Sequence, residues 1–331
     1  MARVLVTGGA GFIGSHVADS LIGRGHEVAV LDDLSGGFRD NVPAAARLVT
    51  ASVTDAAAVD RLFGEISFDY VYHLAAYAAE GLSHFIRRFN YSNNVIGSVN
   101  LINAAVNHDV RGFVFASSIA VYGAGQGTFG EDTPPHPEDP YGIAKLAVEQ
   151  DLRCARDMFG LRYVIFRPHN VYGPGQNIGD RYRNVVGIFM NQILQGRPMT
   201  IFGDGTQTRA FSYVDDVAPV MAEAIDQDAA WNQVFNVGAD QPFTLNQLAV
   251  AVARAMGVEP EITYLPARSE VRDAHSTHAR VAAVFGERPA TSLEDGLAQM
   301  AAWARAHGAR DGKAFDGIEV ARNLPTAWRR T

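Results

Sequence analysis

The sequence predicts an α/β fold built on a doubly wound parallel sheet. Short apolar runs alternate with stretches able to form helices, and the runs cover residues 3–7, 27–32, 47–51, 70–74, 112–117 and 162–167. These runs are apolar throughout rather than alternating, which is typical of strands covered on both faces. Repeated βα units of this kind place helices on both sides of a parallel sheet, as in Rossmann-type folds.

The connections between these runs complete the pattern. Residues 12–23 and 94–107 are expected to form helices that cross between strands, and residues 233–237 to add one more strand. Residues 123–140 contain too many prolines for regular structure. A long loop just before a helix often covers an active site, so we expect this one to lie near the functional residues.

A change in the sequence pattern near Pro168 predicts two domains. Beyond this residue, loops rich in glycine and proline separate fewer strands. We expect a Rossmann-type domain and a smaller C-terminal substrate-binding α/β domain. The first comprises residues 1–167, with 211–238 returning to it, and the second comprises 168–210 and 239–331.

Composition narrows the function classes. The 331 residues carry 28 basic and 36 acidic side chains, a formal charge of −8, and 47% are apolar, so the chain can bury a large core. No basic block stands out that could neutralise phosphates, so nucleic-acid binding is not expected. No apolar run approaches the roughly 20 residues of a spanning helix, and the chain opens on a strand instead of a signal peptide. We expect a cytoplasmic protein that binds no membrane.

Cysteine and histidine give no sign of a metal site. Cys154 is the single cysteine, which excludes an internal disulfide and a multi-cysteine zinc site, and it is expected to lie in the core. His73 ends a predicted strand and is expected to be packed and hydrogen-bonded. His275 and His278 have the spacing of metal ligands but no third partner, so no metal is expected.

Three glycines predict a dinucleotide site. Gly8, Gly11 and Gly14 form Gly-x-x-Gly-x-x-Gly between the first strand and the first helix, where the chain turns sharply and pyrophosphate approaches the helix start. Asp32 ends the second strand, 18 residues after Gly14. A carboxylate there accepts hydrogen bonds from a ribose and repels a 2′-phosphate. No arginine directly follows Asp32, so the pattern favours NAD over NADP.

A serine, a tyrosine and a lysine form a candidate catalytic set. The fifth predicted strand ends in Ser117 and Ser118, while Tyr141 and Lys145 are four residues apart on one face of a helix. An ammonium beside a phenol favours the phenolate and lowers the pKa of the tyrosine. Such a tyrosine is a general base for an alcohol proton. Tyr-x-x-x-Lys also occurs by chance, but the preceding glycine loop and serines favour catalysis.

Several motifs together resemble one family. They are Thr7-Gly-Gly-Ala-Gly-Phe-Ile-Gly, His73-Leu-Ala-Ala, Ser117-Ser-x-x-Val-Tyr-Gly, Tyr141-Gly-x-x-Lys and Arg167-Pro-His-Asn-Val-Tyr-Gly-Pro. From residue 2 to about residue 300 the chain resembles the extended short-chain dehydrogenase/reductases. Within them it is most similar to NAD-dependent nucleotide-sugar 4-epimerases of the UDP-glucose type. The motifs are specific for the superfamily and less specific for the reaction.

The resemblance implies a set of site residues. The implied catalytic residues are Ser118, Tyr141 and Lys145. NAD contacts are implied for Gly8, Gly11, Phe12, Ile13, Gly14, Asp32, Leu34, Ser35, Ser52, Val53, Leu74, Ala75, Ala76, Asn93, Ala116, Tyr141, Lys145 and His169. Contacts with a nucleotide-diphosphate sugar, a UDP-hexose above all, are implied for Ser118, Tyr141, Asn170, Asn184, Val185, Thr200, Phe202, Arg209 and Arg268. A homodimer is also implied, in which helices spanning 94–107 and 141–157 form a four-helix bundle.

Some positions depart from the family pattern. Ser52 stands where relatives carry an acidic residue at adenine, and Ala78 where some epimerases carry a lysine, so one hydrogen bond and one phosphate contact are weaker or missing. Arg268 lies in a stretch one residue shorter than usual. Ala274 corresponds to a position that limits pocket width, where a small residue would admit an N-acetyl group.

An unusual insertion leaves the charge of the sugar open. Arg181 and Arg183 lie within it. The two arginines could neutralise the carboxylate of a glucuronate or simply be solvated, and solvation is the favoured interpretation.

The residues after the catalytic serine favour one reaction. Related 4,6-dehydratases carry an Asp-Glu pair where this chain has Ile119 and Ala120, neither of which can transfer a proton. The resemblance therefore implies epimerisation at C4 through a 4-keto sugar, on UDP-glucose, UDP-glucuronate or UDP-N-acetylglucosamine. A 2-epimerase, a reductase or a dehydratase on the same scaffold is the alternative. A non-catalytic NAD-sensing protein is a more remote one, because it would not need Tyr141 and Lys145.

Overall fold

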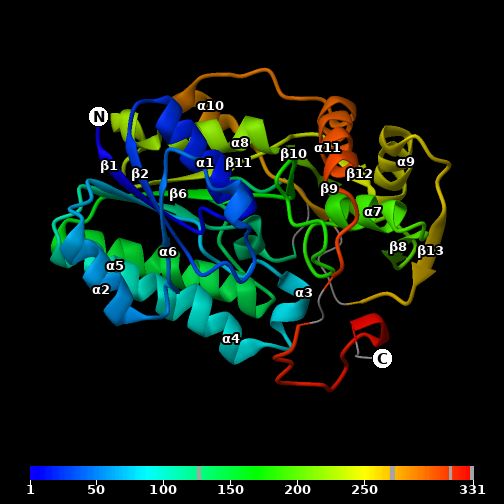
Figure 1. The fold of residues 1–331 in the computed structure, drawn as a ribbon, viewed down its shortest axis with the longest axis horizontal. Helices are drawn as coiled ribbons and strands as arrows, with labels where there is room; N and C mark the ends of the chain where they lie inside the picture. Colours follow the sequence, from blue (N-terminus) through cyan, green and yellow to red (C-terminus); the bar gives the residue numbers. More distant parts are fainter. Residues whose placement is uncertain (125–127, 269–272, 313–314, 329–331) are drawn as a thin grey trace.

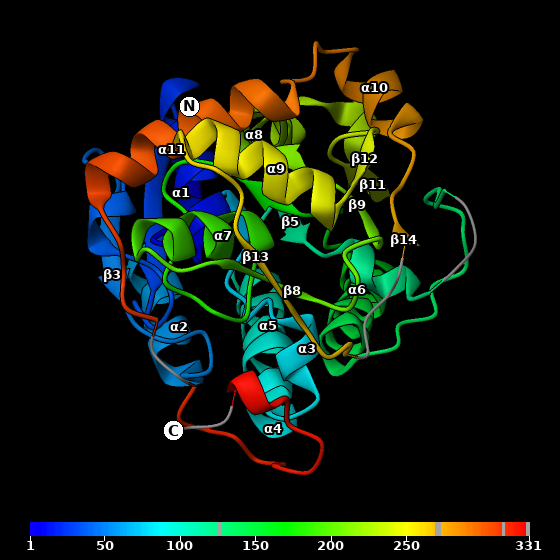
Figure 2. The same ribbon diagram turned by 90° about the vertical axis from the view of Figure 1, so that its right-hand side faces the viewer.

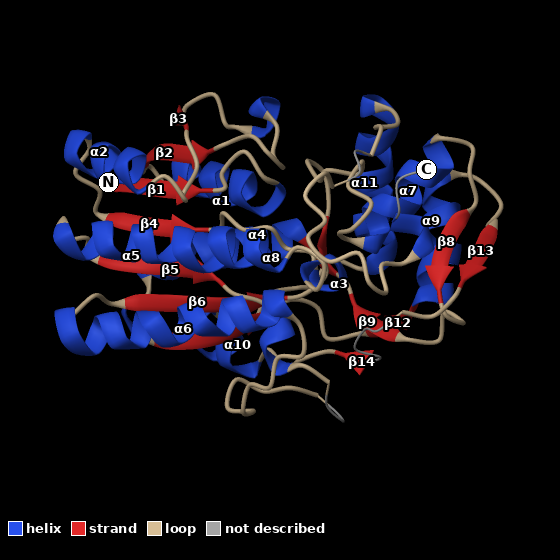
Figure 3. Ribbon diagram, turned by 90° about the horizontal axis from the view of Figure 1, so that it is seen from below, coloured by secondary structure: helices blue, strands red, loops and turns tan. Residues whose placement is uncertain are grey.

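A computed structural model describes residues 1–124, 128–268, 273–312 and 315–328. Its central feature is a parallel sheet of seven strands, β1 (Arg3–Thr7), β2 (Glu27–Asp32), β3 (Arg47–Thr50), β4 (Tyr70–His73), β5 (Gly112–Ala116), β6 (Tyr163–Pro168) and β11 (Gln233–Val237). Their order is β11-β6-β5-β4-β1-β2-β3 (Figure 3). The predicted fold class is confirmed, and every predicted strand agrees within one residue at each end. The order reverses between β1 and β4, where this fold opens a crevice for ligands.

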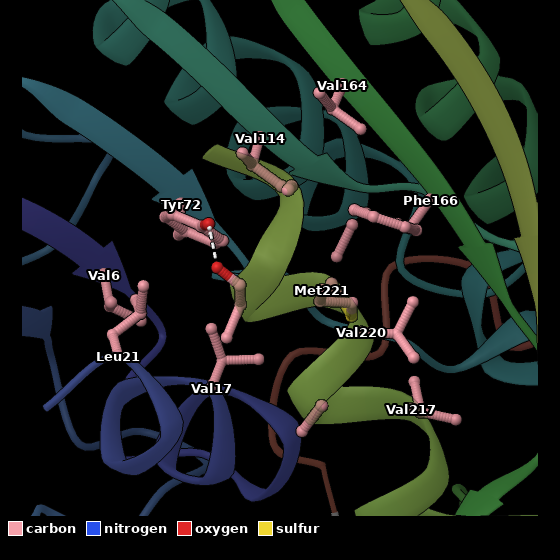
Figure 4. Packing of buried hydrophobic residues seen from close by; sticks show 14 of the residues in the cluster. Val6, Val17, Leu21, Tyr72, Val114, Val164, Phe166, Val217, Val220 and Met221 are labelled. Atoms are coloured by element: carbon pink, nitrogen blue, oxygen red, sulfur yellow. Dashed lines mark hydrogen bonds between the residues drawn. The ribbon is translucent and has the colours of Figure 1, made fainter. Parts of the chain in front are cut away.

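Helices cover both faces of the sheet (Figure 1). One face carries α1 (Phe12–Gly23), α8 (Val214–Ala222) and α10 (Ala279–Phe285), and the other carries α2 (Ala56–Glu65), α5 (Gly97–Asn107) and α6 (Pro140–Phe159). Figure 4 shows the first of these cores, where Val6, Phe166 and Met221 pack together. The hydroxyl of Tyr72 donates a 2.8 Å hydrogen bond to the carbonyl of Ala222 inside it, which satisfies the only polar atom of that side chain.

The helix expected at 94–107 begins differently. α3 (Glu80–Ser83) and α4 (Arg87–Tyr91) are followed by a π-helical turn at Ser92–Ile96 that leads directly into α5. Turns of this kind are common at functional sites. Here Asn94 lies in the turn and bonds both backbone groups of Tyr77, accepting from its N–H at 2.9 Å and donating to its carbonyl at 3.2 Å. The turn therefore holds the segment that follows β4.

A second core forms from later residues. Its helices are α7 (Val185–Leu194), α9 (Leu245–Met256) and α11 (Leu293–His307). Short strands pair around them, namely β7 (Val171–Tyr172) with β10 (Ser212–Tyr213), β8 (Met199–Phe202) with β13 (Ile262–Leu265), and β9 (Thr208–Ala210) with β12 (Pro242–Thr244) and β14 (Asp273–Ala274). The predicted domain boundaries stay a prediction. The C-terminal residues Leu324 and Trp328 pack with Leu82 and Ile86, beside the sheet.

The structure bears on the predictions about Cys154 and about membrane-spanning helices. Cys154 is exposed on α6, so its predicted place in the core is wrong. It falls on the solvent side of a helix whose buried positions nearby are Leu152 and Ala155. In the described part of the chain, no helix is long and apolar enough to cross a membrane.

Candidate active site

A cavity of about 1020 Å³ lies where the carboxyl ends of the sheet strands face the second core. Most of the predicted site residues line it: Gly8, Gly11, Phe12, Ile13, Gly14, Asp32, Ser35, Val53, Leu74, Ala75, Ala76, Asn93, Ala116, Ser118, Tyr141, Lys145, Asn170, Asn184, Val185, Thr200, Phe202, Arg209 and Arg268. Residues from both halves of the sequence therefore meet in one space. Its volume is at the upper end of the range for small-molecule sites, as two ligands would require.

The three predicted catalytic residues lie together at the end of β5 and the start of α6. Asp139 caps α6, since its carboxylate accepts from the N–H of Gly142 at 2.9 Å, and Pro140 occupies the first turn. This start places Tyr141 and Lys145 one turn apart, with the Lys145 ammonium 5.8 Å from the centre of the Tyr141 ring. Ser118 accepts from the N–H of Ala120 at 3.1 Å, which orients its hydroxyl. All three line the cavity.

The pKa of Tyr141 differs from the expectation. Burial raises it well above the ordinary value, the negative charge of Glu80 adds to the rise, and the hydrogen bond with Ser118 opposes it. Lys145 is not among the groups that shift the pKa of Tyr141, and its ammonium donates to the carbonyl of Ala116 at 2.7 Å. Burial lowers the pKa of Lys145 itself to about 7, and the carboxylate of Glu149 opposes that fall. In the protein alone, Tyr141 is a neutral phenol.

A buried polar network supports the end of β5 from below. Glu149 and Arg167 form an ion pair at 2.6 Å, with both side chains almost fully buried. Ser117 donates to Glu149 at 2.5 Å, and Arg167 donates to the hydroxyl of Tyr122 at 2.7 Å. The Tyr122 hydroxyl in turn donates to Asn236 at 2.8 Å on β11. Burial alone would lower the pKa of Arg167, but the ion pair more than offsets it and raises the pKa. The network ties α6, β5, β6 and β11 into one rigid unit.

His73 is packed and hydrogen-bonded, as predicted. Its two ring nitrogens contact the hydroxyls of Thr7 at 2.7 Å and Ser98 at 2.8 Å. Burial, with the positive charge of Lys145 acting in the same direction, lowers the pKa of His73 to about 3. The ring is therefore neutral near pH 7 and links β1, β4 and α5 just below the cavity floor.

The glycine loop fits a pyrophosphate. A Cβ on Gly8 would lie 2.6 Å from the backbone nitrogen of Ala75, and Gly8 has φ +72°, a conformation that favours glycine. A Cβ on Gly14 would lie 2.1 Å from the carbonyl of Gly8. These glycines let the loop fold tightly against α1. α1 itself has no side-chain cap at Gly11, and its first residues line the cavity, so its N-terminal end is available to a phosphate.

Asp32 holds the position expected for a ribose contact. Its carboxylate lines the cavity and accepts from the N–H groups of Ala10 at 3.0 Å and Leu34 at 2.8 Å. Burial raises the pKa of Asp32, and these hydrogen bonds oppose the rise. The bonds fix the carboxylate beside the glycine loop, where two ribose hydroxyls can reach it.

Three predicted cofactor residues are not among the described lining residues of the cavity. Leu34 has a positive φ of 60° and contributes its N–H to Asp32 instead. Ser52 contacts the hydroxyl of Thr54 at 3.0 Å. His169 is buried behind the wall, with a ring nitrogen 3.0 Å from one of His278. The side chains of Ser52 and His169 therefore bond to other side chains of the protein, and any role of Leu34, Ser52 and His169 toward a cofactor stays a prediction.

His278 also contacts Asp240 at 2.6 Å. His275, by contrast, has one buried ring nitrogen without a hydrogen-bond partner. Among the residues the structure describes, no group of three or more His, Cys, Asp or Glu side chains could hold a metal ion.

The predicted substrate residues lie on the second half of the wall. Asn170 donates to the carbonyl of Ala210 at 3.0 Å, and Asn184, which precedes α7, donates to the carbonyl of Val171. Thr200 on β8 is fixed by Gln192, which bonds both its N–H and its hydroxyl. The side-chain amides of both asparagines therefore donate to backbone carbonyls and stabilise the loops around them. Contacts of these residues with a substrate stay a prediction.

The insertion behaves differently from its favoured interpretation. Arg183 lines the cavity, forms an ion pair with Asp180 at 2.7 Å and stacks on the ring of Tyr77 at 4.9 Å. The prediction that Arg183 is solvated is therefore wrong, because its side chain is partly buried against Tyr77 and Asp180. Arg181 is exposed and donates to the carbonyl of Gly312 at 3.1 Å.

Several lining residues were not predicted from the sequence. Tyr77 and Glu80 follow the His73 motif and line the same wall as Tyr141. Trp328, near the C-terminus, lines the cavity from more than 300 residues away in sequence from the glycine loop. The position of Tyr77, four residues after the strand-end histidine, was a usable signal. Nothing local in the sequence marks Trp328.

Comparisons with known proteins identify the family. Residues 4–238 match the NAD dependent epimerase/dehydratase family. The chain is 36% identical to UDP-glucose 4-epimerase of Mycolicibacterium smegmatis, over 90% of this chain and 96% of that one. The structure is similar to UDP-glucose 4-epimerase from Thermotoga maritima with UDP-glucose, with TM-score 0.87, 37% identity and coverage of 92% of this chain and 99% of that one. It is also similar to the Thermus thermophilus UDP-glucose 4-epimerase complex with NAD, with TM-score 0.85, 35% identity and coverage of 91% and 98%. The chain belongs to the NAD dependent epimerase/dehydratase family.

Proposed function

We propose that the protein interconverts the C4 epimers of a nucleotide-diphosphate hexose and keeps NAD bound between turnovers. The observation that carries this proposal is that Ser118, Tyr141 and Lys145 share one wall of a cavity with the glycine loop and Asp32. Bound NAD supplies reversible oxidation of an alcohol carbon to a ketone and a positive charge beside the phenol. Redox balance over a full turnover is then zero, so the cofactor need not exchange.

The chain itself handles the proton. Tyr141, in its phenolate form, accepts the proton of the sugar 4-hydroxyl. After the keto sugar has rotated in the pocket, Tyr141 returns a proton to the same oxygen. Ser118 holds that oxygen by a hydrogen bond. The ammonium of Lys145 lies 5.8 Å from the centre of the phenol ring, and burial lowers the pKa of Lys145 to about 7. Because burial raises the pKa of Tyr141 in the protein alone, the positive charge of a bound cofactor beside the phenol is what makes the phenolate accessible.

Elimination chemistry lacks its side chains here. Removing water from a sugar needs an acid and a base in addition to the tyrosine. Ile119 and Ala120, which follow the catalytic serine, are both buried and carry no group that exchanges a proton. Neither a dehydratase nor a decarboxylase reaction is therefore supported at this position.

The charge of the pocket favours an uncharged sugar. The carboxylate of a glucuronate would need, near the sugar, a positively charged side chain that is not already paired with an acidic residue. Both arginines of the insertion line the cavity: Arg183 is already neutralised by Asp180 at 2.7 Å, and Arg181 is exposed to solvent and donates to the carbonyl of Gly312 at 3.1 Å. We therefore place UDP-glucose and UDP-galactose ahead of UDP-glucuronate, with UDP-N-acetylglucosamine as the other neutral candidate.

Incubation with separate nucleotide sugars tests the function. UDP-glucose, UDP-glucuronate and UDP-N-acetylglucosamine are each added to the purified protein, and the anomeric protons are followed by NMR. The proposal predicts a new anomeric signal of the 4-epimer with a neutral sugar and no change in NADH absorbance. Stoichiometric consumption of NADH would instead identify a reductase, and no new signal with any of the three would reject the proposal.

We infer in addition that the protein works as a cytoplasmic homodimer. Ile96 and Ile143, at the start of α5 and α6, are respectively 53% and 42% exposed, which supports a covered apolar face at the helices predicted to pair. Sedimentation equilibrium checks the dimer, which predicts twice the chain mass of 35.7 kDa.

A further inference from the structure

The chain does not end with the second core. It continues for 24 residues after α11: residues 308–312 run beside α7, and residues 315–328 return to the first domain beside α3 and α4 (Figure 2). We call these two parts the C-terminal strap. The structural match covers nearly all of the Thermotoga chain but leaves part of this chain uncovered. This chain therefore adds residues to the shared scaffold, and the strap is of a suitable length to be that addition.

The strap is fastened to both sides of the cavity. At its start, the backbone of Arg310 exchanges two hydrogen bonds of 2.9 Å with the side chain of Asn191 on α7. Further along, the carboxylate of Glu319 accepts from the N–H groups of Arg88 and Phe89 at 2.8 Å each, at the start of α4. Two independent anchors, one in each half of the molecule, hold the segment in place.

Aromatic packing continues the attachment. Phe315 lies 4.9 Å from the ring of Phe89 and 5.3 Å from that of Tyr77. Leu324 and Trp328 are buried in the same cluster, together with Leu82 of α3. The strap therefore lies against the first domain with an apolar face.

The end of the strap reaches a predicted substrate residue. The guanidinium of Arg268 packs against two rings that also contact each other, 4.5 Å from the centre of Phe202 and 5.5 Å from that of Trp328. Trp328 is 5% exposed, and all three side chains line the cavity. The two adjoining rings limit the directions in which a long, flexible arginine can point, and contacts of this kind strengthen when the charge is partly desolvated.

We propose that the C-terminal strap completes the nucleotide end of the pocket and that Trp328 is a positioning residue which orients Arg268 toward the diphosphate of the substrate. This inference rests on the proposed function for the identity of the ligand. It assigns to a segment outside the family match a role in holding the nucleotide rather than in the chemistry at the sugar. The strap is therefore expected to affect binding and KM, and to leave the proton transfer at Tyr141 unchanged.

The test compares variants of one segment. UDP is titrated calorimetrically into the NAD-loaded wild type, Trp328→Ala, Trp328→Phe and the control Val320→Ala, whose side chain is exposed on the same strap. Loss of one cation–π contact predicts a Kd for UDP raised about tenfold in Trp328→Ala. Trp328→Phe keeps a ring and is expected to remain within about threefold of wild type, and Val320→Ala to be unchanged. In steady-state assays Trp328→Ala raises KM with kcat within about twofold.

The outcomes separate the strap from the reaction. A folded Trp328→Ala protein with the wild-type Kd for UDP overturns the inference. If this variant does not fold, Glu319→Ala releases only the anchor at α4 and must also weaken UDP binding, and an unchanged Kd overturns the inference in the same way. If the variants weaken UDP binding but the wild type epimerises no UDP-hexose, the strap stands and the proposed function fails. A wild type that binds no UDP overturns the inference directly.

Discussion

The two walls of the cavity are built in different ways. On the cofactor wall, Lys145 of α6 is buried and donates to the carbonyl of Ala116, and behind this wall Glu149 and Arg167 form a buried ion pair. On the substrate wall, Arg183 and Arg268 sit on loops and are held by rings and one partly exposed ion pair. The first wall is part of the hydrophobic core, whereas the second is assembled from loops and the C-terminal strap.

This difference suggests how the molecule divides its tasks. Catalytic geometry needs positions fixed within a fraction of an ångström, and the sheet provides them. Specificity for a nucleotide sugar can be altered on loops without disturbing that geometry. Substitutions on the cofactor wall should therefore have large effects on the reaction or on stability, and those near the substrate wall smaller effects on affinity or pH dependence.

Replacing Tyr141 with phenylalanine should give the largest effect. The phenol is the proposed proton acceptor, so Tyr141→Phe is expected to lower kcat by about 10² to 10⁴. The control is Tyr264→Phe, a half-exposed tyrosine on β13 that bonds Asn246. It should retain wild-type kcat and bound NAD. Near-wild-type epimerisation by Tyr141→Phe would remove the tyrosine from the mechanism.

The buried ion pair should dominate the stability of the cofactor wall. Arg167→Met leaves the carboxylate of Glu149 buried without its cation, and the free energy of unfolding should fall by about 3–5 kcal/mol. Arg111→Met removes an arginine whose side chain is 59% exposed and whose pair with Asp69 spans 3.7 Å, and should cost less than about 1 kcal/mol. Urea unfolding of both variants measures the contrast. Equal losses would show that the network is no more important than a surface pair.

The glycine loop offers a matched pair within one helix. A Cβ on Gly14 would collide with the carbonyl of Gly8, so Gly14→Ala should lose most of its bound NAD during purification. A Cβ on Gly23, at the other end of α1, meets nothing within 4 Å. Gly23→Ala should keep its NAD and gain up to about 1 kcal/mol of stability. The cofactor content is read from the absorbance of the released nucleotide, and retention by Gly14→Ala would contradict the account of the loop.

Glu80, at the border of the two walls, should give the smallest effect. Its negative charge raises the pKa of Tyr141, so Glu80→Gln lowers that pKa. Activity on the acidic limb depends on the phenolate, so this limb of the kcat profile should move to lower pH. The shift should stay below about one pH unit, because Glu80 is exposed and screened by solvent. A shift to higher pH would show that the carboxylate assists the tyrosine instead.

The sequence predicted the cofactor wall well for a physical reason. Strands buried on both faces are uniformly apolar, and glycines at Gly8 and Gly14 are required by close backbone contacts, so both leave local signals. The pairing of Tyr141 with Lys145 follows from helical spacing alone. The pKa of Tyr141 could not be predicted in this way, because it depends on burial and on Glu80, which the fold brings close.

The substrate wall left weaker signals. Arg183 was expected in solvent because its partners, Asp180 and Tyr77, are recognisable only once the insertion is folded. Trp328 lies outside any motif, and its contact with Arg268 joins segments 60 residues apart through a fold that periodicity does not encode. Cys154 could not be placed from the sequence either, because neighbouring positions of a helix can differ completely in burial: Cys154 is exposed and Ala155 is buried.

One measurement tests the central claim, that the sugar is oxidised and reduced at C4 with only Tyr141 exchanging a proton. UDP-glucose is converted by the wild-type protein in D₂O, and the product is examined by NMR for deuterium on its ring carbons. The account predicts the 4-epimer with protium at C3, C4 and C5, since no side chain at Ile119 or Ala120 can remove a carbon-bound proton. Deuterium at any of these carbons would contradict it.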